Sequence, residues 1–155
     1  MISRPTTEQL LRNVADDLGS RIHPALAADP ELAVVVEMLQ QLVTSCATRS
    51  AHEIAWLREE QEAMVAYARD VVAAVPEAEA VGAALDAWDR GRDGGLHLDQ
   101  VVADYSLAGE ALSCALEAAL AAGHPELSAR AGALIATRVE REAQVRGSYV
   151  MSGRG

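Results

Sequence analysis

Apolar residues recur three or four positions apart along most of the chain, a spacing that places them on one face of an α-helix. The longest such stretch lies between Pro30 and Pro76, where neither proline nor glycine interrupts the sequence. Asp29 followed by Pro30 is typical of a helix start, because aspartate caps well and proline fits the first turn. We therefore expect one continuous helix from Pro30 to about Val75, although the small and β-branched residues near Thr44–Ser50 also permit a kink. Its apolar positions are Leu32, Val36, Leu39, Val43, Cys46, Leu57, Met64, Ala68, Val71 and Val75.

The same spacing predicts four shorter helices. Thr6 or Thr7 caps the first, and Gly19 ends it. Residues 20–28 are expected to form a connection, because the residue before Pro24 is disfavoured in a helix. The others are expected after Pro76 and over about 98–122 and 125–146, separated by the glycine-rich loop 91–95 and by glycine 123. Their apolar faces, like that of the first helix, repeat at helical spacing: Leu10, Leu11, Val14 and Leu18; Val81, Leu85 and Trp88; Val101, Tyr105, Ala108, Leu112, Ala115 and Ala119; Leu127, Ala131, Leu134 and Ile135.

Composition supports a helical fold. Half of the 155 residues are apolar, only 3% are aromatic, and phenylalanine is absent. Such a composition favours helices over a β-sandwich or barrel. The sequence thus predicts an all-α fold: a single-domain helical bundle, residues 1–155, of about five helices around one long central helix. A short C-terminal tail follows at residues 147–155.

The net negative charge of the chain disfavours anionic binding partners. The net charge is −10, from 23 acidic and 13 basic residues, and every basic residue is arginine. Nucleic acid and anionic membranes require a concentrated positive face, so we expect neither as a partner. No apolar run approaches the ~20 residues of a membrane span and no signal peptide is evident, which predicts a cytoplasmic protein. Cys46 and Cys114 lie in apolar helical patterns and are expected to be buried free thiols.

Charged residues interrupt two of the apolar faces. The face of the long helix continues through Ser50 and Glu53, and Arg49 lies four residues before Glu53 on a neighbouring face. The face of the last helix continues through Arg138 and Glu142, again four residues apart. Charges on a buried face persist only when they are paired or bind a ligand. We therefore expect Glu53 and Arg138 to be buried and charge-paired in a polar layer that fixes helix register or binds a ligand. The candidate polar centre or ligand pocket comprises Arg49, His52, Glu53, Tyr105, Arg138 and Glu142.

The sequence contains no complete catalytic or metal-binding motif. His52 lacks a metal-ligating residue at helical spacing, so no metal and no cofactor are predicted. Without lysine, P-loop and Schiff-base chemistry are excluded, and no nucleophile motif is present. An enzyme is therefore the less favoured interpretation. Three glutamates near Arg58 (Glu59, Glu60 and Glu62) are expected to form a solvated face.

One segment carries a family likeness. The opening Arg4-Pro5-Thr6-Thr7-Glu8-Gln9-Leu10-Leu11, with an apolar helix after Asp29-Pro30, resembles a small all-helical bacterial family of unassigned function. Members are commonly encoded beside aminoglycoside-phosphotransferase-like kinases and acyl-CoA dehydrogenases. The likeness covers the first ~45 residues best. It implies an accessory role and carries over no catalytic residue.

Two functions follow as hypotheses. In the first, the chain is a non-catalytic partner subunit of an aminoglycoside-phosphotransferase-like small-molecule kinase in acyl-CoA or hydroxy-acid catabolism. It would dock through an alanine-rich helix or through the tail, which carries Tyr149, Val150 and Met151. In the second, it is a helical-bundle enzyme or ligand-binding protein whose central Arg/Glu/His pocket holds an anionic small molecule. Alanine-lined helices also permit pairing between chains, so a homo-oligomer stays open.

Overall fold

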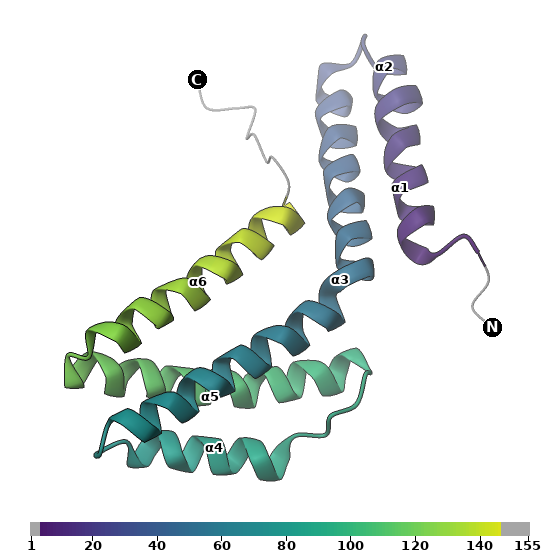
Figure 1. Ribbon diagram of the computed structural model, residues 1–155. Coiled ribbons are helices and arrows are strands. Elements are labelled where there is room, and N and C mark those ends of the chain that lie inside the picture. The colour runs from purple at the N-terminus through teal and green to yellow at the C-terminus, as the bar shows by residue number, and fades with distance from the viewer. Residues whose placement is uncertain (1–3, 147–155) are drawn as a thin grey trace. The chain divides into compact units, whose positions relative to one another are not determined.

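The computed structural model describes residues 4–146, and all the regular secondary structure in that range is helical (Figure 1). The prediction of an all-α fold with a long central helix is confirmed. Contacts group the chain into two compact units. Unit 1 comprises residues 1–53 and 140–155, and unit 2 comprises residues 54–139. The tail proposed above as a docking segment lies outside the described residues.

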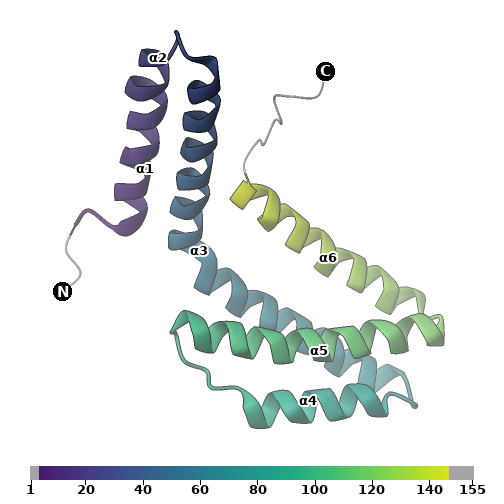
Figure 2. The same ribbon diagram turned by 180° about the vertical axis from the view of Figure 1, so that it is seen from behind.

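Unit 1 contains α1 (Thr7–Asp17) and the first part of α3 (Pro30–Ala74), which lie side by side in both views (Figures 1 and 2). Thr6 is the residue that caps α1: its hydroxyl accepts the Gln9 N–H at 3.3 Å, and the Gln9 side chain accepts the Thr6 N–H at 3.0 Å. Asp29 caps α3 by accepting the Leu32 N–H at 3.1 Å. Both helices therefore begin where their capping residues predict.

The expected connection over residues 20–28 is shorter than predicted. The backbone stays helical through η1 (Leu18–Ile22) and α2 (His23–Ala25), so Gly19 does not end the first helix. The His23 N–H bonds to the Leu18 carbonyl, one residue further back than in an α-helix. This wider π-type turn and the position of Pro24 in the first turn of α2 accommodate the missing proline N–H.

The long helix α3 is continuous over 45 residues, as expected. Its polar segment is accommodated locally, because the hydroxyls of Thr44, Ser45 and Thr48 each donate to the carbonyl four residues earlier. The Ser50 hydroxyl likewise donates to the Ala47 carbonyl. Such bonds satisfy the side chains within the helix and do not interrupt it.

Unit 2 consists of the rest of α3, α4 (Glu79–Gly91), α5 (Leu98–Ala122) and α6 (Pro125–Arg146) as far as residue 139. α4 and α5 pack against each other (Figure 2). Gly123 ends α5 at a positive φ of 62°, which glycine adopts without strain. The buried core draws on all four helices and matches the predicted apolar faces: Met64, Ala68, Val71, Val75, Val81, Leu85, Trp88, Ala108, Leu112, Ala115, Ala119, Leu127 and Ala131.

Candidate functional site

The most distinctive surface of unit 1 is apolar. α1 and η1 expose Leu10, Val14 and Ile22, and the first part of α3 exposes six further large apolar side chains: Leu32, Val34, Val35, Met38, Leu39 and Leu42. Leu42 keeps 59% of its surface exposed and Met38 keeps 54%. Isolated exposed leucines are ordinary, but a contiguous series on neighbouring turns marks an interaction surface.

Much of the apolar surface of unit 1 stays exposed because few large side chains are buried there. The buried apolar residues described in unit 1 are Ala15, Val36 and Ala47. η1 approaches α3 closely at Gly19, where an added Cβ would lie 2.4 Å from the Gln40 side-chain nitrogen. Two of these three buried apolar side chains are alanines, so little apolar surface is buried in unit 1. Cys46, expected to be buried, is also exposed on this surface.

Two of the predicted site residues pair with each other within α3. The Arg49 guanidinium donates to the Glu53 carboxylate, with the Nε contact at 2.9 Å. This pair raises the pKa of Arg49. The expected charge pairing of Glu53 is present, with Arg49 as its partner, but Glu53 is only partly buried and Arg49 is largely exposed. Arg49 and Glu53 therefore lie on a face of α3 that is apolar but not buried.

Glu142 and His52 do not form part of a buried centre. Glu142 accepts from Arg146 at 3.0 Å in an exposed pair four residues apart on α6. The His52 side chain is exposed on α3. The prediction treated interruption of an apolar face as evidence of burial, and in unit 1 that face is in contact with solvent.

Tyr105 and Arg138 do come together in unit 2. The Arg138 guanidinium lies over the Tyr105 ring at 6.0 Å from its centroid, although Arg138 itself is exposed and not buried as expected. The Tyr105 hydroxyl donates to Glu60 at 2.7 Å. Glu60 was expected on a solvated face, and the structure instead gives it a part-buried role between α3 and α5.

A second polar cluster in unit 2 was not predicted. Asp104 of α5 is 1% exposed and accepts from Arg58 of α3 at 2.6 Å. Its oxygens also accept the N–H groups of Asp93 and Gly94, at 2.8 and 3.1 Å. Arg58 donates in addition to the Gly95 carbonyl. The Asp104 carboxylate therefore ties the α4–α5 loop to two helices.

Electrostatics favour the ionised form of Asp104. Burial alone disfavours its charge, but the hydrogen bond from Arg58 and those from the loop N–H groups outweigh burial and lower the pKa of Asp104. Gln61 completes the cluster by donating to the Val101 carbonyl at 2.7 Å. Asp104 and Gln61 both lie on apolar faces at helical spacing, so the rule that selected Arg49 and Arg138 would also have found them.

Tyr67 is the buried polar group that lacks compensation. It is 2% exposed, and none of the described residues makes a hydrogen bond to its hydroxyl. Burial raises the pKa of Tyr67, and the nearby Arg130 opposes this only in part. Tyr67 therefore contributes its ring to the packing of the core.

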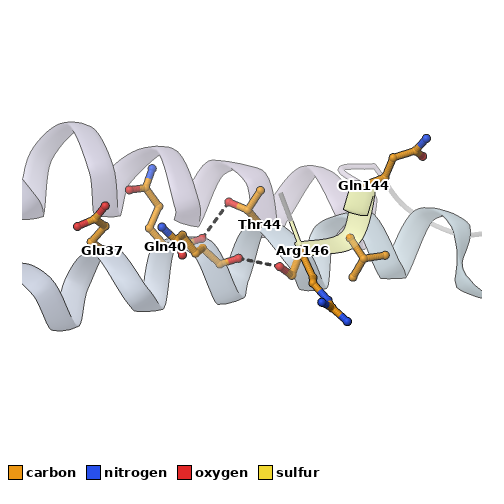
Figure 3. A pocket seen from close by; sticks show the side chains of 8 residues that line it. Glu37, Gln40, Thr44, Gln144 and Arg146 are labelled. Carbon is orange, nitrogen blue, oxygen red and sulfur yellow. Dashed lines mark hydrogen bonds between the residues drawn. The ribbon is translucent and has the colours of Figure 1, made fainter. Parts of the chain in front are cut away.

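Unit 1 also contains a small cavity of about 270 Å³ (Figure 3). It is lined by α3 and the end of α6: Glu37, Gln40, Gln41, Thr44, Ser45, Gln144, Val145 and Arg146. Its volume falls just below the ~300–1,000 Å³ typical of ligand sites. An acidic and a basic side chain, Glu37 and Arg146, both line the cavity. The Thr44 and Ser45 hydroxyls already donate hydrogen bonds to carbonyl groups of α3. The candidate residues Arg49, His52 and Glu53 do not line it.

Within residues 4–146, no three histidine, cysteine or acidic side chains are grouped as metal ligands would be. In the same range, no helix combines the length and apolar character needed to cross a bilayer. Comparison of the chain with protein-family models, curated proteins and solved structures finds no match.

Proposed function

We propose that this protein is a non-catalytic partner subunit that docks onto another protein through the exposed apolar side of α1. The observation that carries the proposal is the exposure of Leu10 and Val14 on α1, which is well capped, and of Ile22 on η1, which continues it. Helices that bury an apolar stripe in a partner's groove use anchors at such spacing.

The proposed partner is an aminoglycoside-phosphotransferase-like small-molecule kinase acting in acyl-CoA or hydroxy-acid catabolism. This part of the proposal rests on the resemblance of the first ~45 residues to a family encoded beside such kinases. The residues that carry the likeness, Arg4 to Leu11, include the start of α1 and one of its exposed leucines. The likeness and the exposed surface thus coincide in the chain.

The alternative, a pocket for an anionic small molecule, has weaker support. The Arg49 guanidinium is engaged by Glu53, and the cavity in unit 1 combines Arg146 with Glu37. Neither arrangement concentrates unpaired positive charge, which an anion site requires. A small-molecule function would be favoured if the purified chain bound acyl-CoA or a hydroxy acid with no kinase present.

The test uses co-expression with the genomically adjacent kinase. We expect the two proteins to co-elute, and kinase activity to differ with and without this chain. Val14→Glu places a charge in the apolar contact and should weaken co-elution at least tenfold. Asn13→Glu, a neighbouring exposed position on the same helix, is the matched control and should leave co-elution unchanged.

Separate elution of the two wild-type proteins, with a kinase equally active alone, would refute the accessory role. Equal loss of co-elution with Asn13→Glu and Val14→Glu would show that added charge, and not the apolar side of α1, is responsible. Circular dichroism of both variants checks that the helices are intact.

A further inference from the structure

The exposed side of α3 in unit 1 has a regular spacing. Six residues follow one another at intervals of four, three, four, three and four positions, and we call them the α3 stripe: Glu31, Val35, Met38, Leu42, Ser45 and Arg49. This alternation is the a/d repeat by which two helices pack along a seam. The centre of the stripe is apolar and its two ends carry opposite charges.

The α3 stripe lies on the side of α3 opposite the contact with η1. Each residue turns a helix by about 100°, so the stripe lies roughly opposite the face that carries Val36, Gln40 and Ala47. That opposite face includes the buried positions and the close contact with Gly19 of η1. The cavity beside the end of α6 adjoins the stripe at one point, because Ser45 lines it together with Glu37 and Gln41. Ser45 is partly buried, and the other five residues of the stripe are exposed.

We propose that the α3 stripe is a dimer interface, in which a second copy of this chain packs antiparallel against it. In antiparallel pairs, a positions of one helix face d positions of the other. With the two-fold axis at position 40, Met38 faces Leu42 of the second copy, and Leu42 faces Met38 of the second copy. Val35 faces Ser45 of the second copy in the same register. Both copies thereby contribute the same residues, Met38 and Leu42, to the apolar centre of the contact, as two-fold symmetry requires.

Charge complementarity selects this orientation. The same register places Glu31 opposite Arg49 of the second copy, at both ends of the interface. A parallel pair would instead align Glu31 with Glu31 and Arg49 with Arg49, and like charges disfavour that arrangement. Arg49 already binds Glu53 within its own chain, but a guanidinium has five donors and can serve a second carboxylate.

The flank of the seam is also suited to a second copy. Leu32, Leu39 and Cys46 lie beside the stripe at intervals of seven residues, and all three are exposed. In the antiparallel register, Leu39 lies next to Leu39 of the second copy across the two-fold axis. Leu32 lies next to Cys46 of the second copy. The apolar surface of α3 is thus used on both sides of the seam.

The surface area that the proposed contact would bury predicts a reversible dimer. Hydrophobic transfer values correspond to about 30 Å² per methylene, so a half-exposed valine or leucine contributes about 55 Å². Six such side chains from each copy give roughly 700 Å², and the polar ends bring the total near the ~1,000 Å² lower bound for specific interfaces. We therefore expect association in the micromolar range. The α1 side remains available for the partner proposed above, on which this inference does not depend.

The first test is the mass of the isolated wild-type chain by sedimentation equilibrium. We expect the mass to rise from 16.4 kDa to twice that value as the concentration rises to about 300 μM. Leu42→Glu should remain monomeric throughout, because it places two charges in the apolar centre. Leu120→Glu, the same change at an exposed leucine of unit 2, is the matched control and should dimerise as the wild type does.

Charge reversal tests the register. Glu31→Arg and Arg49→Glu each create two like-charge contacts and should each weaken self-association about tenfold. Mixed together, the two variants restore opposite charges at both ends, so their mixture should form a heterodimer. The single reversals test the orientation, because in a parallel pair each of them would only exchange one like-charge contact for another and leave self-association unchanged. The heterodimer does not depend on either variant dimerising alone.

Cysteine cross-linking tests the axis. Leu39→Cys, in a chain with Cys46→Ser, should form a disulfide dimer on mild oxidation, and native Cys46 should not. A monomeric wild type at about 300 μM, a dimer that survives Leu42→Glu, no heterodimer on mixing, or rapid linkage through Cys46 would each overturn the proposal. These dimerisation tests are independent of the proposed kinase partner: if Val14→Glu abolished kinase binding, the expected results of all four would stay the same.

Discussion

The two units of this chain carry the same hydrophobic pattern and use it differently. In unit 2, apolar residues at helical spacing on four helices meet and form a buried core around Trp88, Met64 and Val71. In unit 1, equally regular positions such as Leu39 and Leu42 stay exposed, and few large side chains are buried. The spacing defines a face of a helix, whereas the number of neighbouring helices decides whether that face is covered.

The difference extends to the charges. In unit 2, Arg58 and Asp104 form a largely buried pair that fixes a loop. In unit 1, Arg49 and Glu53 form a pair on the surface of one helix. A pair in the interior stabilises through bonds that water cannot replace, whereas an exposed pair competes with water and contributes little.

The largest expected effect is in the core of unit 2. Trp88→Ala should lower the free energy of unfolding by about 3–5 kcal/mol, because it leaves a cavity among buried neighbours. Leu42→Ala in unit 1 should change it by under about 0.5 kcal/mol at a concentration where the chain is monomeric. Urea denaturation of both variants at one low concentration measures the contrast. Similar losses for the two variants would remove the distinction between the units.

The Arg58–Asp104 pair gives the next largest effect. Asp104→Asn should cost about 2–3 kcal/mol, because the partly buried Arg58 loses its carboxylate. Asp89→Asn removes an exposed carboxylate that pairs with Arg69, and it should cost under about 0.5 kcal/mol. Equal costs would mean that Asp104 is solvated.

The same carboxylate predicts a pH dependence. Folding lowers the pKa of Asp104, so its stabilisation is complete above the unfolded value of about 3.9 and is lost as the pH falls through the folded pKa. The stability gap between wild type and Asp104→Asn should therefore be constant from about pH 7 to 5 and shrink below about pH 4. Denaturant titrations over this range measure it. A gap that grows in acid would contradict the assignment.

Two tyrosines of unit 2 differ in whether their hydroxyl has a hydrogen-bond partner among the described residues, so removal of the hydroxyl should have opposite effects on stability. Tyr67→Phe removes a buried hydroxyl for which no described residue is a partner, and should stabilise by about 1 kcal/mol. Tyr105→Phe loses the bond to Glu60 and should destabilise by about 1 kcal/mol. Thermal denaturation of the pair resolves the opposite signs, and destabilisation by both would show that Tyr67 has a partner.

The smallest expected effect is at the predicted polar centre in unit 1. Glu53→Ala removes only a surface pair four residues apart in one helix, so it should cost under about 0.5 kcal/mol. Glu8→Ala, which removes the exposed pair with Arg12 on α1, is a matched control and should behave alike. If urea denaturation showed that Glu53→Ala lowers the free energy of unfolding by several kcal/mol, Glu53 would be buried as the sequence predicted.

Sequence alone predicted the helical elements well. Caps at Thr6 and Asp29, the stop at Gly123 and the breaker-free stretch of α3 are local signals, and the structure follows each of them. The error at residues 20–28 arose because a proline can be accommodated by a π-type turn, which has no strong local signature.

The candidate site was harder to predict. Arg49 with Glu53, and Tyr105 with Arg138, are brought together as local or near-neighbour pairs, but their burial depends on which helices cover which faces. The Arg58–Asp104 pair joins residues 46 positions apart and needs a loop from a third segment. No single-helix pattern contains that information.

Hydrogen exchange by mass spectrometry measures the difference between the two units: the helices of unit 2 bury their apolar faces against one another, whereas the exposed apolar side chains of α1 and α3 in unit 1 are proposed to bind another chain. At low concentration, amides of residues 64–75 and of α5 should exchange slowly, and those of α1 and residues 30–50 should exchange much faster. Raising the concentration, or adding the kinase proposed as a partner, should slow exchange in unit 1 alone. Uniformly slow exchange in both units at low concentration, unchanged on association, would contradict the account.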